Sequence, residues 1–114
     1  MDSRPRYYSR QGRPLTLTEW AQAFENMTEE ARRIALTQIG TDEAGDPITV
    51  STVWIGLDHR WFADGPPLIF ESMVFGGTYD GKAERYATEA EALAGHWRMV
   101  QSMRTLSAWA HSGR

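Results

Sequence analysis

The stretch from residue 48 to residue 75, ITVSTVWIGLDHRWFADGPPLIFESMVF, constrains the fold more than any other part of the sequence. Both of its ends are apolar and rich in β-branched and aromatic side chains, which is typical of strands. The DHRWFADGPP segment between them contains an Asp-Gly turn signal and two prolines, which predict a connection. We therefore expect two antiparallel strands, at about 48–58 and 68–76, to form the central hairpin of a small sheet.

The alternation of side chains along these strands predicts which faces are buried. In the first strand, Val53, Ile55 and Leu57 share a face that becomes fully apolar toward its end. We expect this half of the strand to face the core, and the face that carries Trp54 to be mixed. Both faces of the second strand are largely apolar, which predicts a central position in the sheet.

Two Thr-x-x-Glu capping boxes, at residues 16–19 and 88–91, precede segments with helical periodicity. In this motif the Thr side chain and the Glu side chain each bond a backbone N–H group at the start of a helix. The boxes predict helices at about 17–25 and 89–105. The first helix has an apolar stripe of Leu17, Trp20, Ala21 and Phe24. The second has an apolar face made of Ala92, Leu93, His96, Met99, Val100 and Met103.

Residues 28–40 fit two structures. Local propensity favours a helix, since Thr28 can cap it and Gly40 can end it, but a strand would have a partner across the turn-rich TDEAGDP segment. The sequence as a whole predicts an α+β fold, in which both helices pack on one face of a three- to four-stranded antiparallel β-meander. We expect its strands at about 33–39, 48–58, 68–76 and 83–86.

Length and composition limit the class of protein. A chain of 114 residues allows one core, so we expect a single domain over residues 1–114, with disorder at 1–6 and 111–114. The absence of cysteine excludes disulfides and thiol chemistry, and a net charge of −3 provides no basic field for nucleic acid. We find no apolar run of the ~20 residues that span a bilayer and no signal-peptide core. We expect a protein of the host cell cytoplasm that does not bind membranes.

Four polar side chains at positions that resemble core positions are candidates for chemistry: Asp58, His59, Glu71 and His96. If a helix brought His96 over the hairpin, two histidines and a carboxylate could form an acid–base pair or a metal site. No recognised metal-binding spacing such as HExxH is present. Structural roles explain the same residues, for example a contact of Glu71 with Arg32, Arg33 or Arg85 across the sheet. We therefore expect no metal, no cofactor and a non-enzymatic protein.

Aromatic residues suggest two further surfaces. Trp54, Trp61 and Phe62 would form a protein-binding hot spot if exposed, and would be core residues if buried. Burial in the core is favoured for Trp20, Trp54 and Trp97. For Trp61 and Phe62, in the connection between the two strands, a core position and an exposed binding surface are equally well supported. The second surface is an N-terminal basic and aromatic segment of the kind that binds single-stranded nucleic acid. A charged edge strand also explains it, and the overall acidity favours that alternative. Its residues are Arg4, Arg6, Tyr7, Tyr8, Arg10 and Arg13.

Five segments covering most of the chain are YYSRQGRPLTLTEWAQAFEN, RRIALTQIG, VSTVWIGLDHRW, GPPLIFESMVFGG and RYATEAEALAGHWRMV. Together they resemble a group of small hypothetical proteins encoded by actinobacterial genomes and by their phages and prophages, with a VSTVWxGLDH…PPLIFExMVF signature. The resemblance favours a strand at 33–39 and implies a mobile-element context, but it brings no assigned activity.

In such a context we expect a small non-enzymatic phage or prophage accessory protein that binds and modulates a host or viral protein, or pairs with a second copy of itself. The expected contact surface is the outer sheet face together with Trp54, Trp61 and Phe62. One alternative is a small enzyme or metalloprotein that uses Asp58, His59, Glu71 and His96. Another is nucleic-acid binding through the N-terminal Arg/Tyr segment.

Overall fold

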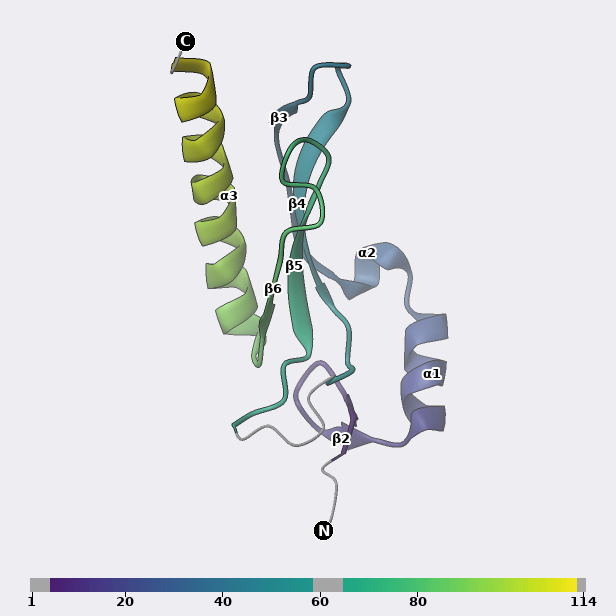
Figure 1. The fold of residues 1–114 in the computed structure, drawn as a ribbon. Coiled ribbons are helices and arrows are strands. Elements are labelled where there is room, and N and C mark those ends of the chain that lie inside the picture. The colour runs from purple at the N-terminus through teal and green to yellow at the C-terminus, as the bar shows by residue number, and fades with distance from the viewer. Residues whose placement is uncertain (1–4, 59–64, 113–114) are drawn as a thin grey trace.

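Antiparallel pairing of consecutive strands builds the centre of the molecule, a four-stranded sheet in the order β3-β4-β5-β6 (Figure 1). The computed structural model describes the backbone of residues 5–58 and 65–112, with side chains as far as Leu106. Each strand pairs with the next one along the chain, so the predicted α+β class and antiparallel meander are confirmed. The strands are Arg33–Thr41 (β3), Pro47–Trp54 (β4), Phe70–Phe75 (β5) and Ala83–Tyr86 (β6).

Helices lie on both sides of this sheet. The helix α3 (Glu89–Ser112) runs along one face and contacts all four strands. The helix α1 (Leu17–Asn26) and the single turn α2 (Glu29–Arg32) lie on the opposite side (Figure 1). The prediction that both long helices share one face is therefore wrong.

The position of α1 follows from what its apolar stripe contacts. The helix lies beside a small hairpin of β1 (Tyr7–Tyr8) and β2 (Pro14–Leu15). The indole Nε1 of Trp20 donates to the carbonyl oxygen of Ile55, just past the end of β4, at 3.1 Å. Trp20 and Phe24 thus hold α1 against the N-terminal hairpin and the end of β4, whereas Leu17 of the predicted stripe is exposed.

Both predicted capping residues begin their helices. The Oγ1 atom of Thr16 accepts from the N–H of Glu19 at 3.1 Å, and the Glu19 carboxylate accepts from the N–H of Thr16 at 2.9 Å. The Oγ1 atom of Thr88 likewise accepts from the N–H of Glu91 at 3.1 Å. These bonds satisfy backbone donors that have no partner inside the helix.

The segment over residues 28–40 combines the two structures that its sequence allows. Thr28 caps the single turn α2, and β3 begins immediately afterwards. Arg32 stabilises this change of direction, since one guanidinium nitrogen donates to the carbonyl oxygens of Phe24 and Met27 at 3.0 and 2.7 Å. The same guanidinium lies 4.3 Å from the centre of the Phe24 ring. The residues that favour a helix form only the single turn α2. From Arg33 onward, pairing with β4 makes the segment a strand.

The face of β4 that packs under α3 is the opposite of the predicted one. Val50, Thr52 and Trp54 are buried there, whereas Val53 and Ile55 lie on the other, partly exposed face. The prediction assumed that a buried face must be fully apolar. Thr52 is tolerated at its centre because its hydroxyl is hydrogen-bonded.

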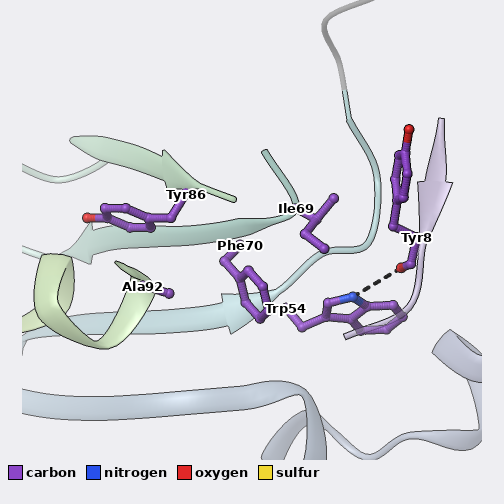
Figure 2. Close-up of a cluster of buried hydrophobic side chains, with 6 residues drawn as sticks. All are labelled: Tyr8, Trp54, Ile69, Phe70, Tyr86 and Ala92. Carbon is purple, nitrogen blue, oxygen red and sulfur yellow. Dashed lines mark hydrogen bonds between the residues drawn. The ribbon is translucent and has the colours of Figure 1, made fainter. Parts of the chain in front are cut away.

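The apolar core beneath α3 consists of two clusters. The first contains Tyr8, Trp54, Ile69, Phe70, Tyr86 and Ala92 (Figure 2). In Figure 2 the indole of Trp54 reaches across to the backbone of Tyr8, where its Nε1 donates to the carbonyl oxygen at 3.2 Å. The second cluster lies further along α3 and contains Val50, Val74, Met99, Val100 and Met103.

The buried face of α3 is narrower than the sequence predicted. Ala92, His96 and Met99 face the sheet as expected. Leu93, which was assigned to the same face, is 44% exposed, and Trp97, which was expected in the core, is 52% exposed. Both side chains lie on the solvent side of the helix, because the contact with a flat sheet covers only a limited arc of its circumference.

Gly95 lies where α3 crosses the ring of Tyr86. A Cβ atom at residue 95 would lie only 2.2–2.3 Å from three atoms of the Tyr86 side chain. We expect Gly95→Ala to reduce the free energy of unfolding by about 1–3 kcal/mol through overpacking. At an open helical position the same change would raise it by roughly 0.5–1 kcal/mol. Urea unfolding followed by circular dichroism measures the difference.

The control for this prediction is Gly95→Ala combined with Tyr86→Leu. Removing the ring removes the obstacle, so in the Tyr86→Leu background the alanine should be neutral or stabilising. If Gly95→Ala alone stabilises the protein, the close approach of helix and ring has no energetic importance.

Candidate functional site

His96, the histidine at the centre of the buried face of α3, is bonded to the sheet through both ring nitrogens. Its Nδ1 lies 2.7 Å from Oγ1 of Thr52 on β4, and its Nε2 lies 2.9 Å from Oγ1 of Thr37 on β3. The Thr52 hydroxyl is also hydrogen-bonded to Ser72 on β5. We call these four residues, His96, Thr37, Thr52 and Ser72, the His96 network. It connects α3 to three strands of the sheet, β3, β4 and β5.

The His96 network is enclosed. The exposed fraction of His96, Thr52 and Ser72 is 0%. Burial lowers the pKa of His96, which favours the neutral imidazole. A neutral ring has one N–H donor and one lone pair, and hydroxyl groups can complement either tautomer. With no access to a substrate, His96 has a structural role, as the alternative interpretation of its sequence position held.

Glu71, the second described candidate, lies on the face of the sheet turned away from α3. Its Oε2 accepts a hydrogen bond from Nε of Arg85, on the neighbouring strand, at 3.0 Å. Arg85 is one of the three partners that the sequence suggested. Because Glu71 and His96 lie on opposite faces of the sheet, they cannot act on one substrate or bind one metal ion.

Asp58 is buried just past the end of β4, where its backbone N–H donates to the carbonyl oxygen of Arg6 at 2.8 Å. His59, its neighbour in sequence, lies outside the described residues. Among the residues that the structure describes, no group of three or more His, Asp or Glu side chains is arranged to hold a metal ion. The described candidates therefore do not form one site.

The three predicted partner-binding aromatics have different outcomes. Trp54 is 1% exposed and belongs to the first core cluster, so its assignment to a partner surface is wrong. Its ring is enclosed by the N-terminal hairpin and by Phe24, whose ring centre lies 6.1 Å away. Trp61 and Phe62 lie outside the described residues.

The N-terminal Arg/Tyr segment makes contacts within the fold. Tyr8 is buried, and Tyr7 packs against Trp20 with ring centres 5.1 Å apart. The Nε atom of Arg10 lies 2.6 Å from the carboxylate of Glu89 at the start of α3. Stacking of bases on both tyrosines would require Tyr8 to leave the core, so this segment does not have the geometry expected of a nucleic-acid site.

Apolar side chains remain exposed on the side of the sheet opposite α3. We call this region the outer face and define it by six uncharged residues of β3, β4 and β5: Leu36, Gln38, Thr49, Ser51, Met73 and Phe75. Leu36 and Phe75 are each 49% exposed. The sequence predicted that an open sheet face would be the contact surface, but the incorrect burial pattern of β4 placed that face on the side of Trp54.

The outer face is hollow along β4. Ser51 lies in register between Leu36 and Met73, so a small side chain has longer ones on both neighbouring strands. A groove of about 260 Å³ continues from this hollow toward α1 and α2. Ser51, Val53, Met73 and Phe75 line its sheet side, and Phe24, Glu29 and Arg32 its helical side.

Comparison with protein-family models, with curated proteins and with solved structures finds no match to this chain. Within the described ranges, no helix is both long enough and apolar enough to cross a membrane. The function must therefore be argued from the outer face, the groove and the His96 network.

The burial of His96 predicts how stability depends on pH. Because the folded-state pKa of His96 is lowered, the unfolded chain takes up a proton first as the pH falls. The contribution of neutral His96 is complete above its ordinary value of about 6.5 and is lost as the pH falls below that value. The free energy of unfolding should fall by at most about 1.4 kcal/mol per pH unit from this source.

Urea unfolding between pH 8 and pH 5 tests this, with His96→Gln as the comparison. The variant keeps hydrogen-bonding capacity but has no titratable ring. Its free energy of unfolding should therefore change less with pH than that of the wild type over the acidic half of the range. Parallel profiles would show that His96 does not titrate with folding.

Replacement of Thr52 tests the network as a whole. In Thr52→Val the imidazole and the Ser72 hydroxyl lose a buried partner, and we expect a loss of about 1–3 kcal/mol in the free energy of unfolding. The matched control is Thr49→Val on the same strand but on the outer face, where a surface change should stay within about 0.5 kcal/mol. Equal effects of the two substitutions would contradict a special role for Thr52.

Proposed function

We propose that this chain is a small non-enzymatic accessory protein of phage or prophage type, which binds and modulates a host or viral protein through its outer face. The observation that supports this most strongly is the open, uncharged surface with Leu36 and Phe75 half exposed. An antiparallel sheet covered on one side usually presents polar side chains on the other. A departure from that pattern marks a surface that a partner can cover.

The outer face has the anatomy of a binding surface. Phe75 offers an exposed aromatic ring, the residue type that is enriched in interface cores. Covering the exposed halves of Leu36 and Phe75 would contribute roughly 1 kcal/mol each by the area that leaves water. The groove adds a charged rim, formed by Glu29, Arg32 and Glu71. Apolar contacts would supply affinity and the rim would supply orientation.

The overall shape supports a protein whose role is contact. Its radius of gyration is 16.2 Å, against roughly 13 Å for a compact domain of this length. The principal extents are 55 × 30 × 21 Å. An elongated molecule offers much surface for its mass. The placement of the candidate catalytic groups also supports a binding role, since His96 and Glu71 both make hydrogen bonds within the fold.

Affinity capture from a lysate of the actinobacterial host tests the proposal. The wild type should retain a host protein that Leu36→Arg and Phe75→Arg fail to retain, because either change places a charge in the outer face. Leu17→Arg is the matched control, since Leu17 is 57% exposed but belongs to α1. A partner retained equally by all four proteins, or no partner at all, would contradict binding through the outer face.

A further inference from the structure

The helix α3 has a second apolar stripe on its solvent side. Ala90, Leu93, Ala94 and Trp97 are all exposed and recur at i, i+3, i+4 and i+7. This spacing places them on one strip of the helix surface, away from the residues that pack on the sheet. In Figure 1 no other helix or strand of the described residues lies beside the side of α3 that faces away from the sheet. We call these four residues the α3 stripe.

We propose that the α3 stripe is the interface of a homodimer, in which α3 packs antiparallel against α3 of a second copy. The two-fold axis passes between Leu93 and Ala94. In an interface of this symmetry the same patch serves both subunits, so it must be complementary to itself. The α3 stripe meets this requirement in shape and in charge.

The shape argument rests on the order of large and small residues. With the axis between Leu93 and Ala94, Trp97 lies against the partner's Ala90, Ala94 lies against the partner's Ala94, and Leu93 lies against the partner's Leu93. The large Trp97 side chain therefore meets a small one, and the alanines allow the helices to approach closely. Interdigitation of this kind is how helices reach the packing density of a protein interior.

The charge argument comes from one flank of the same stripe. Glu91 and Arg98 are both exposed and lie seven residues apart, hence on the same side of the helix. In an antiparallel pair, equivalent flanks face each other and run in opposite directions. Glu91 then approaches the partner's Arg98, and Arg98 approaches the partner's Glu91. Such paired opposite charges determine the orientation of the two copies more than they determine affinity.

The shape and the charge pattern together indicate that the partner of the α3 stripe is a second copy of this chain. An unrelated partner would require neither the alternation of large and small residues about one point nor opposite charges placed symmetrically about it. The inference is independent of the proposed function, since the outer face lies on the other side of the sheet. Pairing through α3 would leave both outer faces open, one on each side of the dimer.

Single cysteines test the geometry directly, because the native chain has none. Ala94→Cys places the two thiols beside the axis, within reach of a disulfide. Gln101→Cys is the matched control, since it is exposed on the same helix but lies roughly 20 Å from its equivalent in this arrangement, at 1.5 Å per residue. Under mild oxidation we expect a covalent dimer from Ala94→Cys and a monomer from Gln101→Cys. Equal cross-linking of both, or of neither, overturns the proposal.

Sedimentation equilibrium tests the energetics. The wild type should dimerise reversibly, and Leu93→Arg should raise the dissociation constant at least tenfold without changing the circular dichroism spectrum. Glu91→Arg should weaken the dimer, and Glu91→Arg combined with Arg98→Glu should restore it. Phe75→Arg on the outer face should leave the dimer intact. A wild type that stays monomeric at millimolar concentration, or a dimer that Phe75→Arg disrupts and Leu93→Arg does not, overturns the proposal.

Discussion

The two hydrogen bonds on the ring of His96 are the constraint on which the layering of this molecule depends. They bond α3 to threonines on two neighbouring strands, so the helix cannot slide or rotate without leaving buried polar groups unpaired. Once His96 faces the sheet, the helical repeat turns Leu93 and Trp97 toward solvent. The buried histidine and the exposed α3 stripe are thus two results of a single helix orientation.

Much of the architecture could be read from local signals in the sequence. The β-branched run before Trp54 and the capping threonines Thr16 and Thr88 each specify a structure over a few residues. These predictions hold because neighbouring positions supply the relevant interactions. The side of the sheet on which α1 lies is different, since it depends on contacts of Trp20 with residues distant in sequence. No local pattern encodes such contacts.

The surfaces were harder to predict than the elements. Apolar alternation favoured Val53 and Ile55 as the buried residues of β4, whereas the folded chain buries Thr52 and satisfies its hydroxyl. A central hydrogen bond thereby outweighs a small difference in hydrophobicity between the two faces of β4. Which face is buried can be predicted only when the hydrogen-bond partner of Thr52, His96, is known. The sequence allowed a structural role for His96 as well as a catalytic one. It could not indicate that Leu36 and Phe75 would remain uncovered.

Two polar residues of the His96 network interrupt the buried rows of β4 and β5 at the same level. Thr52 lies between Val50 and Trp54 on β4, and Ser72 lies between Phe70 and Val74 on β5. Continuous apolar packing therefore does not unite the two core clusters. Their cooperativity depends on directional bonds, which are lost abruptly when geometry is disturbed, rather than on gradual loss of contact area. One layer of hydrogen-bonded side chains thus separates the two apolar clusters, and such a layer is a boundary at which local unfolding can stop.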